Sequence, residues 1–237
     1  MHLLDLTLPT PEENLALEEA LLDLAEAGGA PAGILRLWES ARPFVCLGSN
    51  GKVADDVDTD ACAADGVPVL RRVSGGGTVL QGPGCLNFTV ILPYDRDPEL
   101  RGIHGSYRYI LGRVAAALGG SVEMLGGSDL TVGGGRKIGG NAQRRLSRVL
   151  LHHGTLLHGF DIAAMGRYLR EPPKRPDYRG ARTHGDFAVN LGLPGDDIRR
   201  RLIRVWEAST PPPSWPASEV ERLVRTKYSD PAWNLRR

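Results

Sequence analysis

The sequence predicts an α+β fold, and two observations lead to it. Short candidate strands occur in runs, most densely between residues 119 and 157, where glycine turns separate them. Candidate helices do not alternate regularly with these strands, as they would in a doubly wound parallel sheet. A chain of 237 residues is long enough for one well-buried domain, with room for a small appendage.

The first helix has clearly marked ends. Thr10 can cap it, Pro11 suits its first position, and Glu13 completes a capping-box pattern. Gly28 can end it, so a helix is expected within residues 10–29. Around this helix, strands are expected at residues 2–8, 33–39, 43–48 and 67–73, and a short helix at residues 58–66.

The rest of the chain continues this mixture. Residues 86–93 alternate Leu86, Phe88, Val90 and Leu92 on one face, which predicts a strand. Further strands are expected at residues 129–132, 136–138 and 148–157, and helices within residues 97–120, 161–170, 196–208 and 217–228. The residues rich in proline and arginine at 170–186 are expected to form a loop, and residues 209–218 a stiff connector.

The composition argues against several classes of protein. The formal net charge is +1, so no global field attracts nucleic acid or an anionic membrane. The three cysteines, Cys46, Cys62 and Cys85, lack CxxC spacing, so neither a metal cluster nor a disulfide scaffold is expected. The N-terminus lacks a signal-peptide pattern, and no apolar run reaches membrane-spanning length. We expect a cytoplasmic protein without nucleic-acid or membrane partners.

A first glycine-rich segment, residues 70–88, has features of an anion-binding turn. The glycines at 75–77 follow a candidate strand, and consecutive glycines let backbone N–H groups approach an anion closely. Arg71 and Arg72 precede them, and arginine suits bidentate phosphate binding. A hairpin with two exposed arginines is the alternative. The segment matches neither GxGxxG opening a helix nor GxxxxGK(S/T), so a Rossmann site and a Walker loop are not supported.

A second segment, from residue 126 to 140, is even richer in glycine, with seven glycines among its fifteen residues. It contains Lys137, the only lysine between Lys52 and Lys174. An ammonium group is a compact charge that fits against a phosphate or a carboxylate. Asp129, earlier in the segment, is either a carboxylate of the same site or a turn residue.

A pair of histidines interrupts the apolar strand expected at residues 148–157. Successive side chains of a strand point to opposite faces, so His152 and His153 cannot both face one site. A metal bound by both is therefore not expected. Thr155 shares the face of His153 and is a candidate ligand contact.

Three segments, RRVSGGGTVLQGPGCLNFT, SDLTVGGGRKIGGNAQRR and LLHHGTLL, together resemble the lipoate–protein ligase A family. That family belongs to the wider biotin/lipoate ligase and octanoyltransferase superfamily. NLALEEALL near the start and RTKYSDPAWN near the end extend the resemblance over nearly the whole chain. It implies a mixed, largely antiparallel sheet flanked by helices. We expect a catalytic domain at residues 1–194 and a short helical tail at 195–237, packed on the same domain.

The resemblance also implies a two-step reaction. A lipoate carboxylate attacks the α-phosphate of ATP, which gives lipoyl-adenylate and pyrophosphate. A lysine of a lipoyl-carrier protein then takes the acyl group as an amide. ATP chemistry implies Mg²⁺, which in such sites rests on phosphates and one or two carboxylates, so no dedicated metal cluster is expected.

The site residues carried over from the family centre on Lys137, which would bridge the lipoate carboxylate and the phosphate. The residues expected to bind ATP or the adenylate are Arg72, Ser74, Gly75, Gly76, Gly77, Thr78, Val79, Leu80, Asn87, Asp129 and Thr155. The residues expected to bind lipoate are Lys137, Gly140, His153 and Gly154.

Three departures from the family pattern leave alternatives open. Only about 40 residues follow FAVNLGLP, where larger members carry a second domain, so a separate accessory protein is a candidate partner. Cys85 is either a small buried residue or the thiol nucleophile of an ATP-independent octanoyl or lipoyl transferase. Glycines and Asn141 stand where many relatives have serines. A non-catalytic binding module is a third hypothesis, while the absence of a GRGRxG-type loop disfavours a biotin ligase.

Overall fold

A seven-stranded sheet forms the centre of the molecule in the computed structural model, which describes residues 1–30, 33–172, 175–211 and 214–236. In spatial order its strands are β1 (His2–Asp5), β2 (Ile34–Trp38), β6 (Cys85–Pro93), β10 (Val149–Leu157), β9 (Arg136–Arg145), β8 (Asp129–Val132) and β7 (Glu123–Leu125). The β1–β2 pair is parallel, and the other neighbouring pairs are antiparallel. The prediction of an α+β fold with a largely antiparallel sheet is confirmed.

A second, three-stranded sheet carries the first glycine segment. It has the order β4 (Val69–Arg71), β3 (Phe44–Leu47) and β5 (Val79–Gln81). The predicted strand at 67–73 is confirmed in its central part, whereas β5 was not predicted. A three-residue strand is too short to show the alternation by which strands are recognised.

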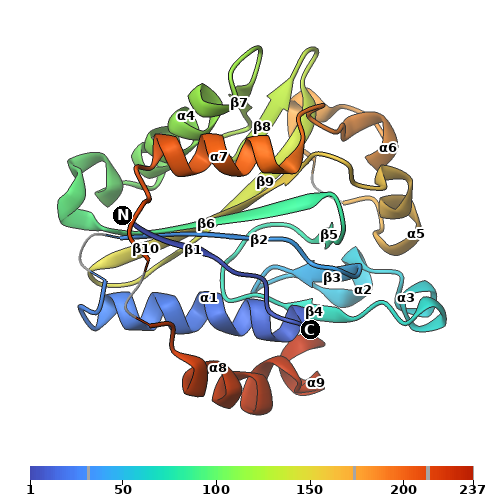
Figure 1. The fold of residues 1–237 in the computed structure, drawn as a ribbon. Helices are drawn as coiled ribbons and strands as arrows, with labels where there is room; N and C mark the ends of the chain where they lie inside the picture. Colours follow the sequence, from blue (N-terminus) through green and yellow to red (C-terminus); the bar gives the residue numbers. More distant parts are fainter. Residues whose placement is uncertain (31–32, 173–174, 212–213, 237) are drawn as a thin grey trace.

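Helices cover both faces of the main sheet (Figure 1). On one face α1 (Pro11–Glu26) packs against β6 and β10, with α8 (Ala217–Leu223) and the π-helical turn η5 (Val224–Tyr228) on its outer side. On the other face lie α4 (Ile103–Leu118) and α7 (Gly195–Val205), which pack against each other. The described residues contain no helix long and apolar enough to cross a membrane.

The strand β6 shows how the sequence pattern produces these two layers. Phe88, Val90 and Leu92 join the hydrophobic cluster that contains Ile110 of α4. Ile91, between them, joins the cluster on the α1 side. The predicted alternation is therefore confirmed, and it places the central strand between two separate cores.

The ends of α1 also follow the prediction. The Glu13 backbone N–H donates to Thr10 Oγ1 (3.2 Å), and the Thr10 backbone N–H donates to Glu13 Oε2 (2.8 Å). This reciprocal capping box fixes the start of the helix. The helix that begins there carries Glu18, which reaches the candidate site described below.

Shorter elements complete the fold. They are α2 (Val53–Asp56), α3 (Thr59–Asp65), α5 (Met165–Tyr168), α6 (His184–Phe187), α9 (Pro231–Asn234) and the 3-10 turns η1 (Tyr94–Arg96), η2 (Pro98–Arg101), η3 (Ile162–Ala164) and η4 (Asp177–Arg179). The helix expected within 161–170 is only η3 followed by α5. The loop expected at 170–186 contains η4 and α6, and its residues 173 and 174 lie outside the described part. Residues 212 and 213 of the expected connector lie outside it too.

One strand is much longer than predicted. The strand expected at 136–138 continues to Arg145 as β9, because β9 pairs with β8 along its first half and with β10 along its second. Glycines in a strand usually weaken it. Here the glycines allow the close pairing described below.

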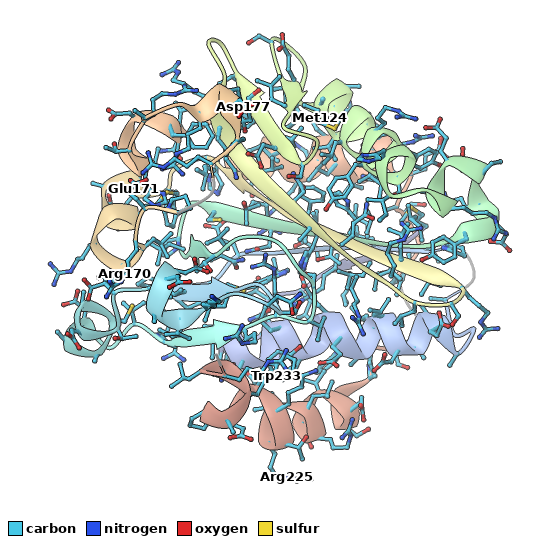
Figure 2. All side chains as sticks on the ribbon, turned by 180° about the vertical axis from the view of Figure 1, so that it is seen from behind. Met124, Arg170, Glu171, Asp177, Arg225 and Trp233 are labelled. Atoms are coloured by element: carbon cyan, nitrogen blue, oxygen red, sulfur yellow. The ribbon has the colours of Figure 1, made fainter. Side chains whose placement is uncertain are left out.

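The C-terminal residues pack on the same body. Trp233 of α9 donates from its indole Nε1 to the Arg71 backbone carbonyl of β4 (2.8 Å). Lys227 Nζ contacts Glu19 of α1 at 2.7 Å. Figure 2 shows Trp233 next to the body of the molecule and Arg225 at its outer edge. A domain boundary between residues 194 and 195 stays a prediction.

Candidate active site

Two adjoining cavities lie between the small sheet and the main sheet. The inner lobe is lined by residues that include Leu15, Trp38 and Cys46. The outer lobe is lined by residues that include Leu169 and Phe187. The two lobes share the lining residues Gly77, Thr78, Val79, Asp129, Lys137, Gly140 and Thr155. Residues from all three sequence motifs therefore meet at the junction of the lobes.

Lys137 occupies that junction as one half of an ion pair. Its Nζ lies 2.9 Å from Asp129 Oδ1 on the adjacent strand β8. The Tyr178 hydroxyl donates to the second oxygen of the same carboxylate, Oδ2, at 2.5 Å. Burial, together with the bond to Asp129, raises the pKa of Tyr178, so the phenol stays a donor. The lysine side chain is 28% exposed, which leaves the ammonium accessible from the cavities.

Two of the glycines around Lys137 are required by close approach. A Cβ on Gly139 would lie 1.9 Å from the Thr155 carbonyl oxygen, and a Cβ on Gly154 would lie 1.9 Å from Asn141 Oδ1. The first is a backbone atom, and the second belongs to an amide held by Ser128 and His152, so neither has much room to move. Glycine therefore lets β9 and β10 pack closely enough to bring Thr155 and Lys137 to one cavity.

The turn after β4 is built around the Arg72 guanidinium. Arg72 donates to the carbonyls of Cys46 (3.0 Å), Gly75 (2.7 Å) and Gly77 (2.9 Å). Its Nε donates to Ser74 Oγ (3.0 Å), and the side chain is almost fully buried. The structure thus places the guanidinium behind the turn, where it holds the loop carbonyls. A direct contact between Arg72 and a phosphate stays a prediction.

The two histidines of β10 face opposite sides, as predicted. His153 lines the inner lobe, with its Nδ1 2.6 Å from Glu18 Oε2. His152 packs between Phe88 and Tyr107 on the other side of the sheet. Burial, helped by the nearby His153, lowers the pKa of His152 to about 3, so this ring is neutral.

Comparison with known proteins then identifies the family. Residues 10–192 match the model of the lipoyl protein ligase A/B catalytic domain. The chain belongs to this family. Most of the candidate site, from Leu15 to Phe187, lies inside the matched range.

Relatives in the lipoyl ligase family carry two different activity names. Lipoate–protein ligase 1 of Staphylococcus aureus is 26% identical over 240 residues, which cover 96% of this chain and 70% of that protein. Octanoyltransferase LipM of Moorella thermoacetica is 27% identical, with 100% of this chain and 98% of that protein covered. Family membership alone therefore leaves open whether the reaction is a ligation or an acyl transfer.

A solved structure supports the fold. A bi-partite lipoate protein ligase from Thermoplasma acidophilum superimposes with a TM-score of 0.84. The match is 24% identical and covers 99% of this chain and 95% of that chain. The mixed sheet with flanking helices is accordingly the catalytic-domain fold of lipoate ligases.

Most residues expected from the lipoyl ligase resemblance line one or both lobes. They are Arg72, Gly76, Gly77, Thr78, Val79, Leu80, Asn87, Asp129, Lys137, Gly140, His153, Gly154 and Thr155. Ser74 and Gly75 are not among the lining residues, and the Ser74 side chain is fully buried. What each residue binds stays a prediction.

Sequence reasoning missed several residues of the site. Glu18 and Trp38 belong to the inner lobe, and Met165, Leu169 and Phe187 to the outer one. For Glu18 a signal was present, because it shares a helical stripe with the buried Leu15 and Leu22. A carboxylate in a buried stripe needs a partner and is therefore worth examining. The outer-lobe residues had no comparable signal.

The residues around the site are relevant to the expected Mg²⁺ and to the role of Cys85. The described residues include no group of three or more potential ligands that could hold a metal by themselves. Two carboxylates, Asp56 and Asp129, do line the outer lobe. Cys85 is buried and lines neither lobe, and burial raises its pKa to about 12. These observations favour the reading of Cys85 as a small buried residue.

Proposed function

We propose that this protein is an ATP-dependent lipoate–protein ligase. It would activate lipoate as lipoyl-adenylate and transfer the lipoyl group to a lysine of a lipoyl-carrier protein. The observation that carries the proposal is the position of Lys137 at the junction of the inner and outer lobes. A cation placed there can contact a carboxylate from one lobe and a phosphate from the other.

The inner lobe suits the acyl chain. Its wall includes the apolar side chains of Leu15 and Trp38, and its mouth reaches Lys137 and Gly140. An acid with a long apolar tail would place the tail among the buried residues and the carboxylate at the lysine. Lipoate and octanoate both have this form.

The outer lobe suits the nucleotide. The backbone of Gly77 and Thr78 borders it, and apolar side chains such as Leu169 and Phe187 offer a surface for a base. Arg170 also lines this lobe, and Figure 2 shows it near Glu171 at one side of the molecule. Asp56 is the carboxylate that would hold Mg²⁺, together with phosphate oxygens, because both oxygens of Asp129 are engaged by Lys137 and Tyr178. The ion would neutralise phosphate charge.

The proposed reaction would use this arrangement in two steps. A lipoate carboxylate oxygen attacks the α-phosphorus, the bond to pyrophosphate breaks, and the ammonium of Lys137 stabilises the charge on the phosphate. A preorganised cation in such a site lowers the activation free energy by about 3 kcal/mol. In the second step the carrier amine attacks the acyl carbon, AMP leaves with the bonding electrons, and the amine loses its proton to solvent.

A second candidate function is acyl transfer without ATP. The nearly full coverage of octanoyltransferase LipM favours it. Such a transfer needs a nucleophile, and the three cysteines of this chain are all buried, with pKa values raised by burial. A non-catalytic module is disfavoured because the Lys137–Asp129 pair sits inside a cavity.

A direct assay distinguishes the ligase, the transferase and the non-catalytic module. The protein, with its accessory polypeptide if required, is incubated with lipoate or octanoate, ATP, Mg²⁺ and an apo carrier domain, and the mass of the carrier is measured by mass spectrometry. We expect the acyl mass shift only with ATP, and its loss in Lys137→Ala, while Lys52→Ala, an exposed lysine, retains it. Modification from octanoyl-carrier protein but never from ATP and free acid would establish the transferase instead.

ATP–pyrophosphate exchange addresses the accessory protein. The similar Thermoplasma acidophilum ligase is described as bi-partite and was studied with its E2 lipoyl domain. We propose that a second polypeptide assists the adenylation step here as well. Full ATP–pyrophosphate exchange by the purified chain alone would contradict this part of the proposal.

A further inference from the structure

A hydrogen-bonded chain of polar side chains runs from α1 to the glycine turn along the wall of the inner lobe. Glu18 Oε2 lies 2.6 Å from His153 Nδ1, and His153 Nε2 lies 2.6 Å from Ser74 Oγ. Arg72 Nε donates to the same Ser74 Oγ at 3.0 Å. The guanidinium ends on the carbonyls of Gly75 and Gly77. Side chains from α1, β10 and the turn are thereby linked without a gap.

The protons along this row of hydrogen bonds have one consistent arrangement. Arg72 can only donate, so Ser74 Oγ accepts from it and uses its own proton for His153 Nε2. Among the described residues no other acceptor lies within reach of the Ser74 hydroxyl. His153 then accepts at Nε2 and donates the proton on its Nδ1 to Glu18. Every bond therefore points toward the carboxylate.

The Glu18 end of the chain is anchored. Burial raises the pKa of Glu18, but the contacts with His153, Arg36 and Thr89 outweigh it and hold the pKa below its usual range. The other oxygen of Glu18 accepts from Trp38 Nε1 (3.0 Å) and Thr89 Oγ1 (2.6 Å). An ionised carboxylate held from three elements gives the chain a fixed origin.

The other end determines the direction of backbone groups in the turn. In a planar trans peptide the carbonyl and the following N–H point in opposite directions. Because Arg72 holds the carbonyls of Gly75 and Gly77, the N–H groups of Gly76 and Thr78 point away from the guanidinium. Within the described residues neither N–H has a hydrogen-bond partner. Thr78 lines both lobes, and Gly76 lines the inner lobe next to Gly77, which both lobes share.

We propose that Glu18, His153 and Ser74 are positioning residues that act through Arg72 to hold the N–H groups of the glycine turn ready for the phosphates of ATP. This inference rests on the proposed ligase function and deepens it. Ser74, His153 and Glu18 have the order of a hydrolase triad. However, the Ser74 side chain is fully buried, so an acyl carbon cannot reach its oxygen.

Steady-state ATP–pyrophosphate exchange with the full chain, and its accessory protein if required, tests the inference. Ser74→Ala removes the hydroxyl that joins His153 to Arg72 and leaves Lys137 untouched. We expect the KM for ATP to rise about tenfold, as for one lost charge-assisted hydrogen bond, with less than about a twofold change for lipoate. Glu19→Gln is the matched control beside Glu18, because Glu19 contacts the C-terminal tail instead.

Nitrogen NMR of His153 gives a readout that packing alone would not change. In the wild-type protein we expect the proton on Nδ1. In Glu18→Gln the new amide can donate to Nδ1, so we expect the proton to move to Nε2 and the KM for ATP to rise. A proton on Nε2 in the wild type would overturn the inference.

The remaining outcomes are equally decisive. An unchanged KM for ATP in Ser74→Ala, with an active wild type, overturns the inference and leaves the ligase function standing. A selective loss of lipoate affinity assigns the chain to the acyl pocket and also overturns it, as does an acyl ester on Ser74 found by mass spectrometry. A wild type that exchanges no pyrophosphate overturns the ligase proposal, and this inference with it.

Discussion

Lys137 and Asp129 form an ion pair across β8 and β9, with 2.9 Å between Nζ and Oδ1. The pair lies where the two lobes of the cavity meet. The carboxylate holds the ammonium in place before a substrate arrives. A substrate carboxylate and phosphate can then share the same cation, so the position of Asp129 controls how well Lys137 is aligned.

Tyr178→Phe tests whether Asp129 aligns Lys137, without changing either residue of the ion pair. The Tyr178 hydroxyl donates to the second oxygen of Asp129, so its removal leaves the carboxylate less firmly oriented and the lysine less well placed. We expect kcat for adenylation to fall about tenfold, since small misplacements of a reacting group are costly. Tyr168→Phe is the control, because its hydroxyl binds Asp65 away from both lobes. Equal kcat values for the two variants would contradict the role of Tyr178.

Gly139→Ala tests whether the glycines of β9 are there for close packing. Its Cβ would lie 1.9 Å from the Thr155 carbonyl oxygen, so β9 and β10 would have to separate. We expect a loss of about 1–3 kcal/mol in the free energy of unfolding, measured by urea denaturation, together with weaker ATP binding. Gly133→Ala is the matched control, since nothing lies within 4 Å of its Cβ. Similar losses in both variants would show that chain flexibility, and not contact, explains the glycines.

Much of the fold could be predicted because short local patterns in the sequence indicate its helices and strands. The capping box at Thr10 and the alternation from Leu86 to Leu92 are local signals, and both are confirmed. The end of β9 was missed because glycine in a strand usually signals a break, whereas Gly139 is demanded by a neighbour that is distant in sequence. Contacts of this kind are set by tertiary packing, which local patterns do not report.

The site was predictable to the extent that its residues lie in compact motifs. Lys137 and the glycine turn could be found, because each contributes a run of adjacent residues. Glu18 was overlooked, although its place among buried leucines of α1 is unusual for a carboxylate. Phe187 and Leu169 reach the outer lobe from separate short elements, and neither residue is distinctive in the sequence.

Cys85 provides a prediction about reactivity. Burial raises its pKa to about 12, so the thiolate is scarce at neutral pH. We expect no labelling of Cys85 by iodoacetamide in the native protein, no acyl thioester in mass spectra, and full ligase activity in Cys85→Ser. Labelling in urea confirms that the reagent can reach the thiol once the chain unfolds. A thioester on Cys85 in the native protein would support acyl transfer over ligation.

His152 predicts how stability depends on pH. Burial lowers its pKa to about 3 in the folded protein, against an ordinary value of 6.5. Between these values the unfolded chain binds a proton that the folded protein does not, so stability falls as the pH decreases. The contribution of one such group is about 1.4 kcal/mol per pH unit.

Urea unfolding at pH 6.5, 5.5 and 4.5 measures this contribution between the folded and unfolded pKa values of His152. We expect His152→Gln to be less stable at pH 6.5, because the hydrogen bonds of the ring with Gln143 and Asn141 are altered. The slope of its unfolding free energy against pH should nevertheless be smaller than that of the wild type, by nearly the value for one proton. His104→Gln, at an exposed histidine, should keep the wild-type slope. Parallel curves for wild type and His152→Gln would mean that His152 is already protonated in the fold, which its hydrogen bond from Gln143 argues against.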